Sequence, residues 1–154
     1  MIRMRKAFSI VELMIVVAIL GILAAIVVPQ FNSQSRTARN ATARTNLQSL
    51  RGAIRLYATR NGGVPPGYPG NDTSAIPTFA TIEAQLTGFG GYLTEMPENP
   101  FNKKTACKVL GNLDAFPAAP GQTDQYGWIY QPATETIRLN WPGTDTEGVD
   151  YYAY

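Results

Sequence analysis

The chain lacks histidine altogether and has a single cysteine, Cys107, among its 154 residues. Without histidine it cannot form a Ser-His-Asp or Cys-His nucleophilic site, or a metal site that uses imidazole ligands. A glycine-rich phosphate-binding loop of the expected form is also missing. Because Cys107 has no second cysteine to pair with, we expect a buried, reduced thiol rather than a disulfide. These absences together argue against an enzyme.

Charged residues make up only 16% of the chain, and their small positive excess is concentrated at the N-terminus. Three of the 13 basic residues, Arg3, Arg5 and Lys6, precede residue 8, whereas the remaining chain holds ten basic and eleven acidic residues. The formal net charge of +2 therefore gives no support for nucleic-acid binding, and we expect no nucleic-acid partner. The three N-terminal charges instead favour a cytoplasmic N-terminus, with the C-terminal part across a membrane.

The chain does contain one long apolar run. Residues 8–28 include only three that are not plainly apolar, namely Ser9, Glu12 and Gly21. A helix of this length, at about 1.5 Å per residue, covers roughly the 30 Å hydrocarbon core of a bilayer. A cleavable secretory signal has a shorter apolar core, about 7 to 15 residues, followed by a small-residue cleavage site. The run therefore predicts a membrane-spanning helix, and its carboxylate, Glu12, marks a candidate functional site.

The residues before and after the start of this run form a motif. Residues 5–12 read Arg-Lys-Ala-Phe-Ser-Ile-Val-Glu. This stretch resembles the N-terminus of type IV pilins and of type II secretion pseudopilins, which share a basic leader, a small residue and Phe-Thr/Ser-Leu/Ile-Ile/Val-Glu. The resemblance implies cleavage by prepilin peptidase between Ala7 and Phe8, and N-methylation of Phe8. One departure is that Ala7 stands where the family usually has glycine.

The resemblance also implies roles for residues of the apolar helix. Glu12 would be the family's buried glutamate, and Gly21 and Pro29 fall where the family has a helix glycine and a proline that kinks the helix. An unpaired charge among packed apolar helices costs several kcal/mol. Cleavage after Ala7 would supply a partner, the positive amine of Phe8, on a neighbouring subunit. We therefore expect Phe8 and Glu12 to act in filament assembly.

Helical periodicity continues beyond the apolar run, so we expect one helix from residue 8 to about residue 60. An apolar stripe with spacings of three and four should pack on a globular domain; it consists of Leu47, Leu50, Ile54 and Tyr57. We expect a second face of the helix to be solvated, and the alternative is that it contacts other subunits. This face consists of Arg44, Gln48, Arg51 and Arg55.

A stop signal at residues 61–66, Asn-Gly-Gly-Val-Pro-Pro, ends this helix. We therefore divide the chain into a leader (1–7), a transmembrane and assembly helix (8–29), an amphipathic helix (30–63) and a periplasmic globular domain (64–154).

The sequence pattern of the globular part predicts one short helix and a small sheet. Residues 78–86 have helical periodicity, with Gly88 just beyond them. Residues 126–130 and 136–140 predict two strands joined as a hairpin, and residues 108–110 a third strand. The expected fold class is α+β, in which a long N-terminal helix packs on a small antiparallel β-sheet, as in the pilin fold.

Short motifs at residues 47–51, 97–102 and 127–130 resemble G-type major pseudopilins. That group carries calcium in a C-terminal loop, and residues 143–150 occupy a comparable place here. Asp145, Glu147 and Asp150 are therefore calcium candidates, since calcium favours carboxylate and carbonyl oxygens on a flexible loop. The family's local pattern is not reproduced closely.

The resemblance implies a structural subunit of a type II secretion pseudopilus, anchored once in the inner membrane until it polymerises in the periplasm. Its partners would be further copies of itself, minor pseudopilins, prepilin peptidase, membrane lipid, and an assembly platform with its cytoplasmic ATPase. A type IV pilin for adhesion, motility or DNA uptake is the alternative, which the lack of a disulfide loop disfavours. A membrane-anchored binding module that never polymerises is a third possibility.

Overall fold

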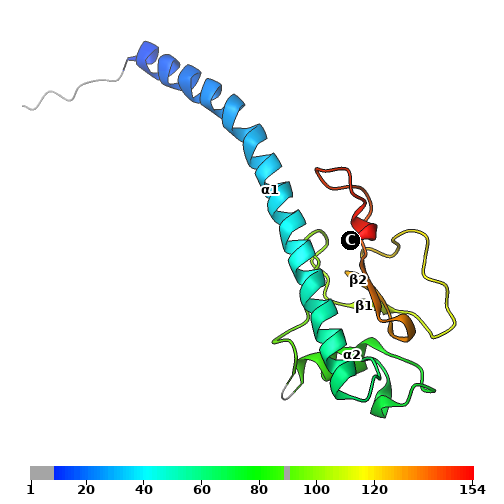
Figure 1. Ribbon diagram of the computed structural model, residues 1–154. Helices are drawn as coiled ribbons and strands as arrows, with labels where there is room; N and C mark the ends of the chain where they lie inside the picture. The colour runs from blue at the N-terminus through cyan, green and yellow to red at the C-terminus, as the bar shows by residue number, and fades with distance from the viewer. Residues whose placement is uncertain (1–8, 89–90) are drawn as a thin grey trace, which may run out of the picture. The chain divides into compact units, whose positions relative to one another are not determined.

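The computed structural model describes residues 9–88 and 91–154 (Figure 1). The chain divides into two compact units, one ending at Arg36 and the other spanning Thr37–Tyr154. The boundary falls inside the expected amphipathic helix, residues 30–63. Ala7 and Phe8, the predicted processing residues, lie outside the described residues.

Helix α1 (Ile10–Arg60) is 51 residues long and continues through Gly21 and Pro29, which confirms the expected helix to about residue 60. Its segment Ile10–Val27 has a mean hydropathy of 3.0, and none of it is buried. By length and composition this segment can cross a membrane. Because so much apolar surface is costly in water, the segment requires lipid or other apolar helices around it.

In the second unit, the C-terminal part of α1 supplies one wall of the core. Leu47, Leu50 and Ile54 are each at most 1% exposed. They belong to one buried cluster with Trp128, Tyr130 and Leu139 of the sheet. The predicted apolar stripe therefore packs on the globular domain as expected.

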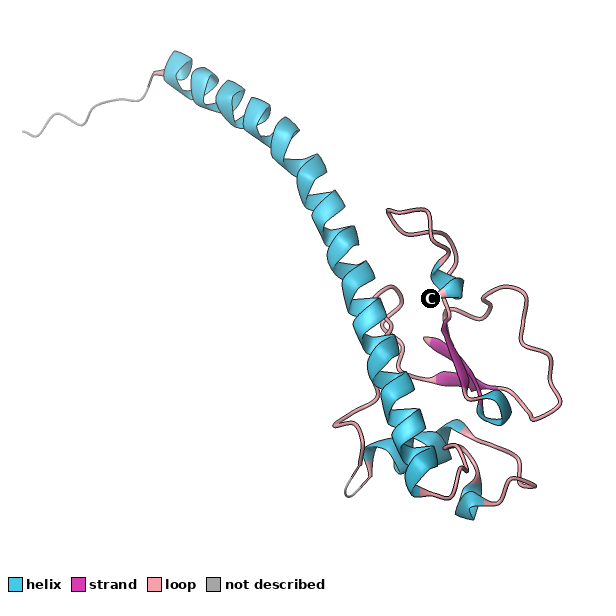
Figure 2. Cartoon of the chain, viewed as in Figure 1, coloured by secondary structure: helices cyan, strands magenta, loops and turns pink. Residues whose placement is uncertain are grey.

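The sheet has three strands, β1 (Cys107–Val109), β2 (Trp128–Gln131) and β3 (Thr136–Leu139), in the order β1-β2-β3 (Figure 2). Strands β2 and β3 form the predicted antiparallel hairpin, with Trp128 opposite Leu139. A 3-10 turn, Pro132–Thr134, connects them.

The expectation of an entirely antiparallel sheet was wrong for β1, which runs parallel to β2 with Cys107 opposite Trp128. The reason is the connection, residues 110–127, which is too long for a tight hairpin and returns the chain to the end of the sheet where β1 begins. The sheet is thus mixed, and the α+β class is confirmed.

Helix α2 (Phe79–Thr87) follows the prediction closely. The Thr78 hydroxyl accepts a hydrogen bond from the Thr81 N–H at 3.2 Å and so caps the N-terminus. Ile82 and Leu86 are buried in the same core as α1. Cys107 lies in this core as an unpaired, buried thiol, as expected, and burial raises its pKa to about 12. At neutral pH the thiol stays protonated and unreactive.

Candidate functional site

Glu12 lies in the first turn of α1 and bonds to the residue that caps the helix. The Ser9 main-chain N–H donates to Glu12 Oε2 at 3.5 Å, and the Val11 N–H donates to Ser9 Oγ at 3.3 Å. This reciprocal arrangement, Ser-x-x-Glu, is a capping box, which gives acceptors to N–H groups that the first turn leaves unpaired. A carboxylate at this end of a helix is also favoured by the helix dipole.

The side chains next to Glu12 form an uncovered apolar surface. Ile10, Val11, Leu13 and Met14 are all more than half exposed. Glu12 is the one charged residue in the segment Ile10–Val27. If other apolar helices cover this surface, the carboxylate leaves water and needs a positive partner beyond its weak cap.

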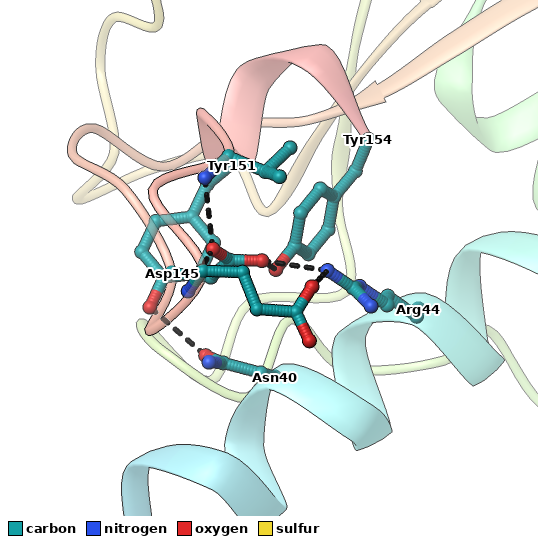
Figure 3. Close-up of polar contacts among 7 residues, drawn as sticks. Asn40, Arg44, Asp145, Tyr151 and Tyr154 are labelled. Carbon is teal, nitrogen blue, oxygen red and sulfur yellow. Dashed lines mark hydrogen bonds and ion pairs between the residues drawn. The ribbon is translucent and has the colours of Figure 1, made fainter.

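A second candidate site lies where residues 143–154, here called the C-terminal segment, meet α1 (Figure 3). Arg44 Nη2 lies 2.6 Å from Asp145 Oδ2 and 3.3 Å from Glu147 Oε2. The Arg44 guanidinium also lies over the ring of Tyr154, 4.7 Å from its centroid. One turn earlier on α1, Asn40 Oδ1 accepts a hydrogen bond from the Tyr151 hydroxyl.

Arg51 extends this contact toward the sheet. Its guanidinium donates to the main-chain oxygens of Tyr154 and Ile137. Burial and the nearby charge of Arg55 lower the pKa of Arg51, but it starts so high that the group stays charged. Helix α1 therefore contacts both the C-terminal segment and strand β3 through the Arg51 side chain.

The carboxylate of Asp145 is fully hydrogen bonded. Oδ1 accepts from the main-chain N–H groups of Glu147 at 2.8 Å and Val149 at 2.9 Å. Oδ2 accepts from the Tyr154 hydroxyl at 2.7 Å and from Arg44. The side chain is 1% exposed. The Tyr154 bond, with these other donors, lowers the pKa of Asp145 to about 2, so the group is charged at neutral pH.

Comparison with known proteins bears on the first of these sites. The family pattern described as the prokaryotic N-terminal methylation motif matches residues 2–28. The type II secretion system core protein G of Pseudomonas aeruginosa is 30% identical over 114 residues, which cover 74% of this chain and 80% of that protein. The chain belongs to the type II secretion system core protein G family. The Aeromonas hydrophila core protein G is likewise 30% identical, over 117 residues, 74% of this chain and 82% of that protein.

A fimbrial relative matches less of the chain than the core protein G relatives do. A fimbrial protein of Neisseria meningitidis serogroup B is 36% identical over 83 residues, which cover 53% of this chain and 46% of that protein. No solved structure matches the chain at a significant level. The chain is thus a pseudopilin with an N-methylation motif and an apolar helix suited to a single-pass membrane anchor.

In this chain, the three calcium candidates do not converge. Glu147 bonds to Arg44 and its side chain is 70% exposed, whereas Asp150 Oδ1 accepts from the Tyr152 N–H and caps the 3-10 helix Tyr151–Ala153. Within residues 9–88 and 91–154, no three acidic or cysteine side chains form a group that could hold a metal ion. Calcium binding by Asp145, Glu147 and Asp150 stays a prediction.

The sequence analysis missed Arg44, Arg51 and Tyr154 as members of this contact. The face that carries both arginines was expected to be solvated or to meet other subunits. Arg44 is indeed exposed, although it also contacts the C-terminal segment, whereas Arg51 is partly buried against that segment. The one available signal was the presence of arginines on α1 and carboxylates in residues 143–150. Opposite charges alone do not tell which residues meet across the fold.

Proposed function

We propose that this chain is a structural subunit of a type II secretion pseudopilus, cleaved by prepilin peptidase between Ala7 and Phe8 and N-methylated on Phe8. The observation that carries the proposal is the methylation motif at residues 2–28 in a chain whose relatives are named core protein G. The uncovered apolar segment Ile10–Val27 supports it, because such a surface suits lipid before assembly and neighbouring helices afterwards.

In this proposal the subunit is held in the inner membrane with its N-terminus in the cytoplasm and residues 64–154 in the periplasm. It then polymerises with further copies and with minor pseudopilins into a helical fibre that drives protein export. An assembly platform and its cytoplasmic ATPase supply the work, so the chain itself acts structurally.

Glu12 has a defined part in this assembly. Within the described residues of the single subunit, the Ser9 main-chain N–H donates a long hydrogen bond of 3.5 Å to the Glu12 carboxylate. In the fibre, the amine of Phe8 on a neighbouring subunit becomes the positive partner of the carboxylate. Such a pair sets the axial register of the helices more than it adds net stability.

The test is a clean deletion of the gene, followed by comparison of the culture supernatant and the cell surface. We expect secreted proteins to accumulate inside the cells while surface fibres persist, and we expect the wild-type gene to restore secretion. Loss of surface fibres with normal secretion would instead identify a type IV pilin, the alternative that the Neisseria fimbrial relative favours.

Mass spectrometry of the N-terminus tests processing separately. We expect a chain that begins with methylated Phe8. A chain that keeps residues 1–7 in cells would overturn the proposal and favour an anchored module that does not polymerise.

A further inference from the structure

Several oxygen atoms of the C-terminal segment that could bind calcium already accept hydrogen bonds. Calcium takes six to eight oxygen ligands at about 2.3–2.6 Å. Both oxygens of Asp145 already accept two hydrogen bonds each, and one oxygen of Asp150 accepts from the Tyr152 N–H. An oxygen lone pair that faces an N–H or O–H donor is not directed at a metal ion.

Some main-chain oxygens of the segment also accept hydrogen bonds. The oxygen of Gly143 accepts from the Tyr151 N–H at 3.0 Å, and that of Val149 accepts from the Asp145 N–H at 2.8 Å. These bonds close the segment on itself around Asp145. The donor set present therefore does not fit the calcium ion that the G-type resemblance implies.

Arg44 stands where a cation would be required. Its guanidinium contacts the carboxylates of Asp145 and Glu147 and the ring face of Tyr154, so three negatively polarised groups surround one positive group. The side chain extends from α1, where Asn40 one turn earlier and Arg51 two turns later also bond to the segment. Helix α1 thus holds the positive charge of Arg44 against the C-terminal segment.

We propose that the Arg44 guanidinium replaces calcium as the cation of the C-terminal segment, and that the fold of this pseudopilin is consequently independent of calcium. The proposal concerns the fold of the single subunit, so its test gives the same answer whether or not the proposed secretion function is correct. It predicts that the globular part keeps its stability where free calcium is scarce.

The first test uses the full chain in detergent micelles. Its thermal midpoint is measured with excess EGTA and with millimolar CaCl2, and MgCl2 at equal ionic strength serves as the salt control. We expect the same midpoint in all three conditions. A midpoint that CaCl2 raises and EGTA lowers, without a matching effect of MgCl2, would overturn the proposal.

The second test removes the cation. We expect Arg44→Ala to lower the midpoint by roughly 4 °C or more, with or without EGTA, since Asp145 loses a charged donor. The matched control is Arg55→Ala, an exposed arginine of the same helix, which should leave the midpoint unchanged. If Arg44→Ala does not fold, Arg44→Lys replaces it and should still lower the midpoint, because a single ammonium reaches both carboxylates poorly. A wild-type midpoint in the variant would contradict the proposal.

Discussion

The hydroxyl of Tyr151 donates a 2.9 Å hydrogen bond to the side-chain oxygen of Asn40, and both side chains are buried. The two residues lie 111 positions apart in the sequence. This bond is neutral, so it fixes the C-terminal segment to α1 independently of the charged contact at Arg44. The ring of Tyr151 packs beside those of Phe101 and Tyr154, at 4.6 and 5.5 Å between centroids.

Tyr151→Phe keeps the ring and leaves the Asn40 oxygen without its donor. A buried acceptor left unpaired costs about 1–3 kcal/mol, so we expect that loss in the free energy of unfolding. Denaturant titration of the full chain in detergent measures it. Tyr126→Phe is the control, since Tyr126 is only half-buried, and it should change stability by less than about 0.5 kcal/mol. Equal stability of both variants would contradict the role of the bond.

Unlike Tyr151→Phe, Tyr130→Phe should not lower the free energy of unfolding. In the part of the chain that the structure describes, the Tyr130 hydroxyl is buried and has no hydrogen-bond partner, and burial raises its pKa. Removing an unpaired buried hydroxyl relieves a desolvation cost of about 1–3 kcal/mol. We expect the variant to be at least as stable as wild type in the same titration. A clear loss of stability would show that the hydroxyl has a partner.

Gly127→Ala tests the close packing at the start of β2. A Cβ atom at this position would lie 2.1 Å from the main-chain oxygen of Lys104, so the backbone must move. Such overpacking typically costs about 1–3 kcal/mol. Gly121→Ala is the matched control because a Cβ atom there meets no other atom within 4 Å. Thermal unfolding should give a lower midpoint for Gly127→Ala than for Gly121→Ala, and equal midpoints would contradict the prediction.

Asp145 should make stability depend on pH in the acid range. Its pKa lies near 2 in the folded chain, below the ordinary 3.8, so the unfolded chain binds more protons between these values. The stabilisation is therefore fully present above about pH 4 and is lost as the pH falls toward 2. Unfolding measured from pH 5 to pH 2 should show a shallower decline for Asp145→Asn than for wild type. Asp124→Asn, an exposed carboxylate, should leave the slope unchanged.

Glu12→Ala should leave a membrane-inserted chain that assembles poorly. Without the carboxylate, the Phe8 amine of a neighbour has no partner, and an uncompensated buried charge lowers fibre yield by roughly tenfold or more. Sheared fibres and membrane fractions are compared by immunoblot. Ser9→Ala removes the cap but keeps the charge, so its fibre yield should stay near wild type. Equal loss in both variants would assign the effect to capping, and normal yield in Glu12→Ala would refute the role of Glu12.

The parts of the fold that depend on neighbouring residues could be predicted from the sequence. Helix α1 was expected from its apolar run and from the spacing of Leu47, Leu50 and Ile54, and α2 from its own periodicity and the glycine after it. The β2–β3 hairpin followed from alternation and a short connection. Each of these signals comes from residues close together in the sequence, the range over which helix and hairpin patterns are set.

Contacts between distant residues could not be predicted in the same way. The parallel pairing of β1 with β2 depends on the path of residues 110–127, which carry no local pattern that fixes it. The contact between Arg44 and Asp145 joins residues 101 positions apart. Several carboxylates could have met this arginine equally well by charge alone, and only the packed core selects Asp145.

This separation has a consequence for the order in which the subunit is completed. A ribosome adds roughly 5–20 residues per second, so Asp145 is synthesised about 5–20 s after Arg44. For most of that interval β3 has not yet been synthesised, so the stripe at Leu47 and Leu50 lacks part of the sheet that covers it in the finished subunit. Asp145 therefore becomes available only after all three strands have been made, and a chain whose synthesis stops before residue 143 has the sheet but lacks both Asp145 and the core residue Tyr151.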